Sequence, residues 1–102
     1  ISWLKPAAES GDVEAQSNLG KCYLEGIGTS VNYAEAVKWL ELAAASKDSN
    51  ALANLGACYY RGLGVEKDAK KGRALIAEAA KRGNEEASMV WRRRTTKRPN
   101  RN

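Results

Sequence analysis

The stretch LGKCYLEGIGTSVN, residues 19–32, returns 36 residues later as LGACYYRGLGVEKD, residues 55–68. Leu, Gly, Cys, Tyr and two further glycines recur in the same order and at the same spacing. The match also extends outward, because the Trp-Leu pair at residues 3–4 returns at residues 39–40. Self-similarity at a period of roughly 20–50 residues is typical of a solenoid built from stacked structural units.

The repeat divides the chain into five segments. Two complete repeats occupy residues 13–48 and 49–84, and residues 1–12 correspond to the second helix of a preceding partial repeat. After the second repeat we expect a C-terminal capping helix over residues 85–94 and a basic tail over residues 95–102. We therefore predict an all-α fold, an α/α superhelical solenoid of antiparallel helix pairs.

Each complete repeat predicts two helices joined by a glycine-rich turn. The first helices are expected over residues 13–25 and 49–61, where Ala, Leu, Cys and Tyr recur on one helical face. They end at Gly26 and Gly62, because glycine readily adopts the left-handed conformation that closes a helix. The step of two residues to the next glycine keeps the link to the second helix short.

The second helices are expected over residues 33–46 and 69–82. Asn32 and Asp68 precede them, and both residue types are good N-caps because their side chains accept hydrogen bonds from the first free N–H groups. Gly83-Asn84 predicts the end of the later of these two helices.

Two glycines lie inside the predicted first helices, where a glycine costs about 0.5–1 kcal/mol relative to alanine. They are Gly20 and Gly56. A close approach of another backbone explains this cost, and Ala36 and Gly72 are the small residues expected to meet them from the second helices. The residues then expected to fill the wider space between successive helix pairs are Tyr23, Tyr59 and Trp39.

This pattern resembles the Sel1-like repeat family, which shares recurring Leu-Gly, Tyr, Gly-x-Gly-Val, Asp and Ala-Ala signals. The matching positions of the second copy are Ala51, Leu55-Gly56, Tyr59, Gly62, Gly64-Val65, Asp68, Ala79-Ala80 and Gly83. Gly72 and Leu75 depart from the family's Ala and Trp, which the first copy keeps as Ala36 and Trp39. The resemblance covers residues 3–91. It implies a solenoid related in shape to tetratricopeptide arrays, and a role as an adaptor or scaffold in protein complexes.

The residues offer little support for catalysis, a cofactor or a metal. The sequence contains no His, which excludes Ser-His and Cys-His nucleophiles. The glycine pairs follow a predicted helix rather than a strand, and they lack the Lys-Ser/Thr of a phosphate-binding loop. Cys22 and Cys58 have no further soft ligands around them that would complete a zinc site. We therefore predict no enzyme, no cofactor and no metal.

The two cysteines occupy equivalent repeat positions. Packed helices lie about 8–10 Å apart, whereas a disulfide needs Cα atoms within about 7 Å. We therefore expect two free, mostly buried thiols, which fits a reducing compartment. No apolar run is long enough to span a membrane, so a soluble protein is expected. Because the first residue is not Met, we expect a processed product or an excised fragment, and the compartment stays open.

The net charge of +5 comes from the C-terminal end of the chain. Six cations and no acid lie within residues 92–102, namely Arg92, Arg93, Arg94, Lys97, Arg98 and Arg101. Such a segment is able to bind nucleic acid or an anionic membrane surface. It has no aromatic residue for stacking on bases, so we keep this as the alternative to protein binding.

The favoured function is protein binding through the concave face, which the first helices of such solenoids line. The candidates are residues of those helices that do not match between copies and do not point into the core. They are Glu14, Ser17, Lys21, Leu24, Asn50, Ala53, Ala57, Tyr60, Arg61, Met89 and Arg93. Tyr60 and Arg61 lead this group, because Tyr and Arg are enriched at interface hot spots. The expected partner is an extended peptide or a helix, and an oligomer through the N-terminal half-repeat stays open.

Overall fold

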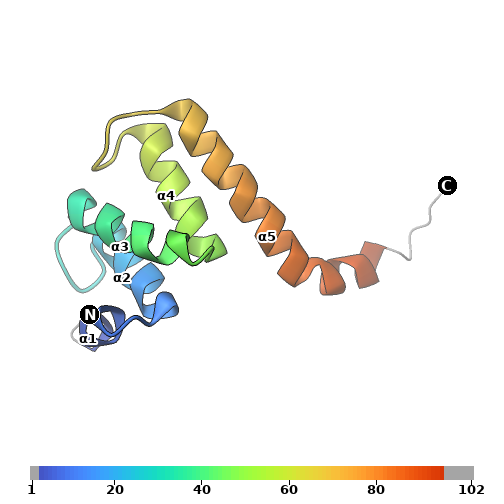
Figure 1. Ribbon diagram of the computed structural model, residues 1–102, viewed down its shortest axis with the longest axis horizontal. Helices are drawn as coiled ribbons and strands as arrows, with labels where there is room; N and C mark the ends of the chain where they lie inside the picture. The colour runs from blue at the N-terminus through green and yellow to red at the C-terminus, as the bar shows by residue number, and fades with distance from the viewer. Residues whose placement is uncertain (1–2, 96–102) are drawn as a thin grey trace.

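The computed structural model describes the backbone of residues 3–95 and the side chains of residues 3–83. This part of the chain forms five helices and no strand, so the predicted all-α class is confirmed (Figure 1). The helices are α1 (Leu4–Glu9), α2 (Val13–Glu25), α3 (Tyr33–Ala45), α4 (Ser49–Arg61) and α5 (Ala69–Thr95).

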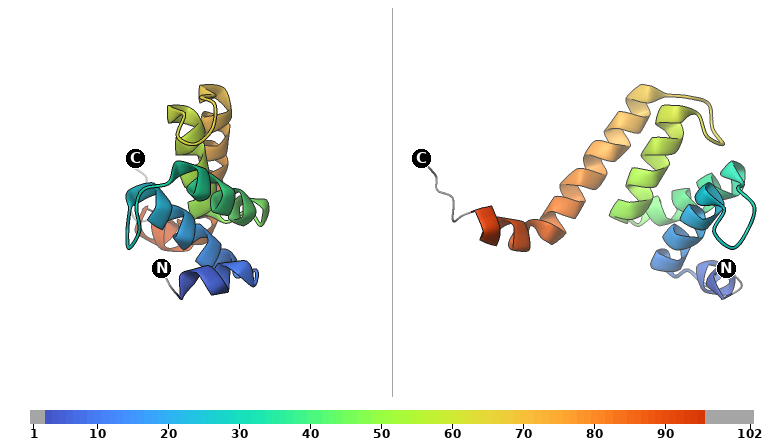
Figure 2. Two further views of the ribbon diagram at one scale, coloured as in Figure 1. Left: turned by 90° about the vertical axis from the view of Figure 1, so that its left-hand side faces the viewer. Right: turned by 180° about the vertical axis from the view of Figure 1, so that it is seen from behind.

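The helices pack in the order of the chain. α2 and α3 form one antiparallel hairpin, and α4 and α5 form a second. α3 also packs against α4, so the two hairpins stack, and α1 lies against α2 at the N-terminal end of the stack (Figure 2). α2 touches α4 directly, which places the first helices of the two hairpins side by side. This arrangement is the predicted α/α solenoid.

Four helices begin with the same polar contact. In each, the side chain of the residue before the helix accepts a hydrogen bond from the backbone N–H three residues later. The pairs are Asp12 with Ala15 at 3.0 Å, Asn32 with Glu35 at 3.1 Å, Asp48 with Ala51 at 2.9 Å, and Asp68 with Lys71 at 3.0 Å. Each such cap stabilises a helix by about 1 kcal/mol. The predicted N-caps Asn32 and Asp68 are thereby confirmed.

The two glycine-rich turns have the same conformation. Gly26 and Gly62 close α2 and α4 with left-handed φ values of 70° and 75°. The carbonyl oxygen of Tyr23 accepts the N–H of Asn32 at 2.8 Å, and its counterpart Tyr59 accepts from Asp68 at 2.8 Å. The predicted ends of both first helices are therefore confirmed, and each turn is fixed to the helix before it.

The predicted helix end at Gly83-Asn84 is wrong, because α5 continues through these residues to Thr95. Residues 85–94 are helical, as expected, but they belong to α5 rather than to a separate capping helix. A glycine permits a left-handed cap without imposing one. Within a helix it keeps the backbone hydrogen bonds at a cost of about 1 kcal/mol. The equivalent residue of the first copy, Lys47, does take a left-handed φ of 66°.

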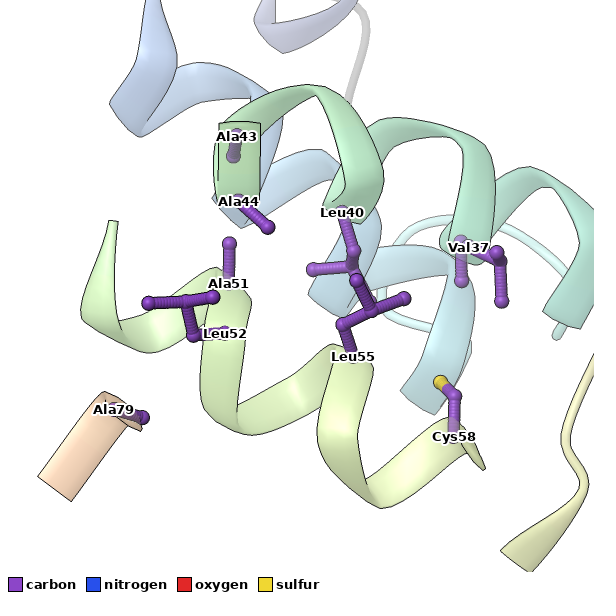
Figure 3. Packing of buried hydrophobic residues seen from close by; sticks show 10 residues of the cluster. Val37, Leu40, Ala43, Ala44, Ala51, Leu52, Leu55, Cys58 and Ala79 are labelled. Atoms are coloured by element: carbon purple, nitrogen blue, oxygen red, sulfur yellow. The ribbon is translucent and has the colours of Figure 1, made fainter. Parts of the chain in front are cut away.

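Two hydrophobic clusters hold the stack together. The larger one joins α3, α4 and α5, with Leu40 and Leu55 at its centre and Ala79 at its edge (Figure 3). The smaller one surrounds Trp39, which packs against Leu4 of α1 and Leu19 of α2. Trp39 thus fills the space between α1 and the first hairpin, as predicted.

The glycines inside the first helices are points of close contact, as predicted. A Cβ atom added at Gly20 would lie 2.6 Å from Cγ of Leu40 and 3.2 Å from the carbonyl oxygen of Ala36. One added at Gly56 would lie 2.7 Å from Cγ1 of Ile76 and 2.8 Å from the carbonyl oxygen of Gly72. In the second hairpin the obstacle is therefore partly backbone, which cannot move aside as a side chain can.

Replacing Gly56 by Ala should destabilise the protein although alanine is the better helix former. The added methyl group must push the α5 backbone away, and overpacking of this kind costs about 1–3 kcal/mol. Urea unfolding followed by far-UV circular dichroism measures the change in the free energy of unfolding.

The matched control is Gly83→Ala, because nothing lies within 4 Å of a Cβ atom at Gly83. This change should stabilise α5 by up to about 1 kcal/mol. If Gly56→Ala proves as stabilising as Gly83→Ala, the hairpins do not depend on close backbone contact.

Candidate binding surface on the first helices

Helices α2 and α4 form a polar groove between them. Its lining residues are Ser17, Asn18 and Lys21 from α2 and Asn50, Ala53 and Asn54 from α4, and its volume is about 210 Å³. We call this hollow the α2–α4 groove. The groove forms because the two hairpins stack with their first helices, α2 and α4, in contact. Side chains one turn apart on each helix lie on the same face, so those of α2 and α4 line the groove from its two sides.

The groove has an internal symmetry that follows from the repeat. Ser17 corresponds to Ala53 and Asn18 to Asn54, since each pair is 36 residues apart. The two carboxamides therefore stand at equivalent points of successive hairpins. Among the side-chain hydrogen bonds of residues 3–83, none involves either of them, so both carboxamides present donors and acceptors to a ligand.

The groove is uncharged apart from Lys21. Ser17 forms part of its floor, since the residue is only 4% exposed, whereas Asn18 and Lys21 are exposed. Such a lining offers hydrogen bonds at low desolvation cost and one positive charge at its edge. It suits a polar, uncharged chain better than a phosphate or a metal ion.

Comparison with known proteins gives a family match over most of the chain. The Sel1 repeat matches residues 1–12, 13–48 and 49–84. The chain belongs to the Sel1 repeat family. None of the curated proteins compared with the chain matches it.

Two solved Sel1-type structures resemble this chain closely. One is a protective antigen present in uropathogenic Escherichia coli strains that displays an SLR fold, with 41% identity and a TM-score of 0.76. The other is a Sel1 repeat protein from Oxalobacter formigenes, with 35% identity and a TM-score of 0.76. They cover 80% and 90% of this chain, which spans only 18% and 27% of theirs.

These matches establish a solenoid of Sel1 repeats. Proteins of this family generally mediate protein–protein interactions and generally act as non-catalytic scaffolds. The contacts that a given Sel1 repeat makes must come from its own surface residues.

Of the binding residues predicted from the sequence, Ser17, Lys21, Asn50 and Ala53 lie together in the α2–α4 groove. The others do not line it. Glu14 is exposed near the start of α2, Leu24 packs against the larger hydrophobic cluster, Ala57 is half-buried, and Tyr60 and Arg61 are exposed at the end of α4. Met89 and Arg93 lie on α5 beyond the described side chains.

Sequence reasoning missed Asn18 and Asn54. Both were set aside because they match between the two Sel1 repeats, which is the expected behaviour of core residues. A signal was present nevertheless. A core position recurs as an apolar residue, whereas a recurring carboxamide beside a buried leucine indicates a recurring polar contact.

All six cations of the C-terminal segment lie beyond the described side chains. Arg92, Arg93 and Arg94 lie on α5 where only the backbone is described, and Lys97, Arg98 and Arg101 lie outside the described residues. Binding of nucleic acid or a membrane surface through this segment therefore stays a prediction.

The glycine-rich turns of these Sel1 repeats join two helices, as predicted, rather than a strand and a helix. Beside the second turn lies a hollow of about 560 Å³ lined in part by Tyr59, Asp68 and Lys71. Lys71 Nζ stands over the Tyr59 ring at 4.4 Å, and the Tyr59 hydroxyl donates to Glu41 at 3.3 Å. Tyr59 and Lys71 are thus engaged with each other, and Tyr59 is also engaged with Glu41.

Other chemistry finds no support in the described part of the chain. Its residues contain no group of three or more His, Cys, Asp or Glu side chains arranged to hold a metal. None of its helices combines the length and the apolar character that a membrane crossing requires. Both cysteines, Cys22 and Cys58, are free.

The two thiols should differ in reactivity. Cys58 is fully buried, and burial raises the pKa of its thiol, whereas Cys22 is half-buried. Since the thiolate is the reactive form, iodoacetamide at pH 8 should modify Cys22 first and reach Cys58 only when the hairpins open. Peptide mass mapping over time measures the order. In a Cys22→Ser variant only Cys58 is left to react. If iodoacetamide modified it as fast in the folded protein as in urea, that result would contradict the buried position of Cys58.

Proposed function

We propose that this chain is a binding scaffold that holds an extended segment of a protein partner in the α2–α4 groove. The observation that supports the proposal is the pair of equivalent carboxamides, Asn18 and Asn54, in one polar hollow. The general role of Sel1 repeats in protein–protein interaction agrees with it.

A carboxamide suits a peptide backbone because it has both a donor and an acceptor. It pairs with the N–H and C=O of one peptide unit without reading the side chain. Stacked helices lie about 8–10 Å apart, and an extended chain advances about 3.3 Å per residue. Asn18 and Asn54 are therefore spaced to hold backbone groups about three residues apart.

An extended segment fits these groups better than a partner helix does. The backbone N–H and C=O groups of a helix are already paired with each other, apart from those of its ends. A helix in the groove would leave the carboxamides of Asn18 and Asn54 without partners, and an unpaired buried polar group costs about 1–3 kcal/mol. Lys21 at the edge of the groove adds a preference for a carboxylate near that point of the segment.

Removing both carboxamides should weaken peptide binding without unfolding the protein. The probe is a set of peptides selected from a random display library for binding to the wild-type chain. Each lost hydrogen bond contributes about 1 kcal/mol, so Asn18→Ala and Asn54→Ala should each lower the affinity about fivefold, and the double variant more than tenfold. Fluorescence anisotropy gives the affinities.

The matched control is Lys5→Ala, an exposed change on α1 away from the groove. It should leave affinity unchanged, and thermal melts should show that all variants fold. Selected peptides that bind the double variant as tightly as the wild type would disprove the groove as the binding site.

Tyr60 and Arg61 should contribute to the binding of partners whose extended segment continues past the groove along α4. Ala57 and Arg61 follow Ala53 at steps of four residues, so they continue the same helical face. The side chain of Tyr60 is 46% exposed, so truncation leaves the core intact. The double change to Ala should lower the affinity of long peptides several-fold and leave peptides confined to the groove unaffected. An equal effect on both lengths would contradict this extended path.

A further inference from the structure

The outer side of α5 has an exposed apolar strip between cations. Its members are spaced at alternating steps of three residues and one residue, which places them on one helical face: Arg73, Ile76, Ala77, Ala80 and Lys81. We call this set the α5 outer face. All five residues are exposed, including Ile76, of which 40% is accessible. One flank of Ile76 nevertheless packs on α4, since its Cγ1 would lie 2.7 Å from a Cβ atom at Gly56.

Three of the five equivalent positions in the first hairpin are covered by a helix, whereas Glu41 and Ala45, the counterparts of Ala77 and Lys81, are exposed. Val37, Leu40 and Ala44 correspond to Arg73, Ile76 and Ala80, and they are 6%, 0% and 9% exposed. α4 covers them through Leu52 and Leu55 (Figure 3). In the first hairpin, therefore, the part of this face formed by these three positions receives a helix. In the part of the chain that the structure describes, no helix lies over the α5 outer face, because α5 runs straight on through residue 83.

The charge of the α5 outer face differs from that of its counterpart. Arg73 takes the place of Val37, and Lys81 lies one residue beyond Ala80. Residues 69–83 contain five Lys and Arg and a single carboxylate, Glu78. Glu78 already accepts a hydrogen bond from Arg82 at 3.3 Å and pairs with Lys47 at 3.6 Å. The hydrogen bond from Arg82 and the charge of Lys47 both hold the pKa of Glu78 below its usual range.

Glu78 is therefore engaged with Arg82 of α5 and with Lys47, which leaves Arg73 and Lys81 without a carboxylate partner among the described side chains. A hollow of about 470 Å³, lined in part by Ala77, Glu78, Lys81 and Arg82, lies at the edge of the face. Its volume is enough for side chains of a docked helix.

We propose that the α5 outer face binds an acidic amphipathic helix of a protein partner. Its apolar residues cover Ile76, Ala77 and Ala80, and its Glu or Asp residues pair with Arg73 and Lys81. This surface is separate from the α2–α4 groove, so the two proposals stand or fall independently.

Charge argues against the other occupants. A second copy of this chain would bring its own Arg73 and Lys81 against the same cations, and residues 92–102 hold six cations and no acid. A membrane is less suitable, because helices that lie in a bilayer surface use large apolar residues. Here Ile76 is the single large one, and the alanines beside it favour close approach of a helix.

The test uses two synthetic amphipathic peptides of about five helical turns with the same Leu stripe, one flanked by Glu and one by Lys. Binding to the full chain is followed by fluorescence anisotropy. The Glu peptide should bind and the Lys peptide should not. Arg73→Glu with Lys81→Glu should weaken the Glu peptide tenfold or more and make the Lys peptide bind, an exchange that a folding defect does not produce.

Two further variants keep the result decisive. Ala80→Trp should block the Glu peptide by bulk while peptides selected for the groove still bind. Lys5→Glu with Lys38→Glu makes the same charge change elsewhere and should leave the affinity for the Glu peptide within about twofold, because exposed charges far apart are screened.

Several results would overturn the proposal. One is an affinity for the Glu peptide that survives charge reversal, and another is an affinity that disappears when residues 96–102 are deleted. A third is an effect of Ala80→Trp confined to self-association in sedimentation, which assigns the face to a second copy. A fourth is an effect confined to binding of anionic phosphatidylserine vesicles, which assigns it to a membrane.

Discussion

The close backbone contact inside each hairpin determines the rest of the structure. In the second hairpin, a Cβ atom at Gly72 would lie 2.6 Å from the carbonyl oxygen of Gly56, and one at Gly56 would lie 2.8 Å from the carbonyl oxygen of Gly72. No side chain larger than a hydrogen atom fits at Gly56 or at Gly72. α4 and α5 must therefore cross where these two glycines meet. Because helices are stiff, fixing this crossing also fixes which residues of each hairpin face its neighbour.

Equivalent positions of the two repeats differ in whether they contact a neighbouring helix in both copies or in only one. Positions that meet a neighbouring helix in both copies are constrained to small or apolar residues, as with Leu19 and Leu55. Positions that meet a neighbour in only one copy are free to diverge, and the change from Val37 to Arg73 is the clearest example. A short solenoid thus acquires distinct surfaces from nearly identical units.

Local interactions explain why much of this fold could be predicted from the sequence. Helix limits at Gly26 and Gly62 and the cap at Asn32 depend on residues within one turn, so the sequence pattern alone indicates them. A glycine permits either a left-handed helix end or an unbroken helix, so the sequence at Gly83 does not decide between them. In the structure α5 continues through Gly83. Four of the six residues that line the groove were predicted; Asn18 and Asn54 carry a signal in the sequence, but that they line one hollow is seen only when α2 and α4 lie side by side.

The two ends of the described stack bury their large apolar side chains to different extents. At the N-terminal end, α1 has only six residues, and Trp39 compensates by burying a large side chain against it. The indole Nε1 has no hydrogen-bond partner among the described residues, which costs about 1–3 kcal/mol. Burying roughly 150–250 Å² of indole at about 25 cal/mol per Å² contributes about 4–6 kcal/mol, so burial wins. At the other end of the described stack Ile76 is 40% exposed, and it lies between the exposed cations Arg73 and Lys81 rather than beneath a further helix of the described residues.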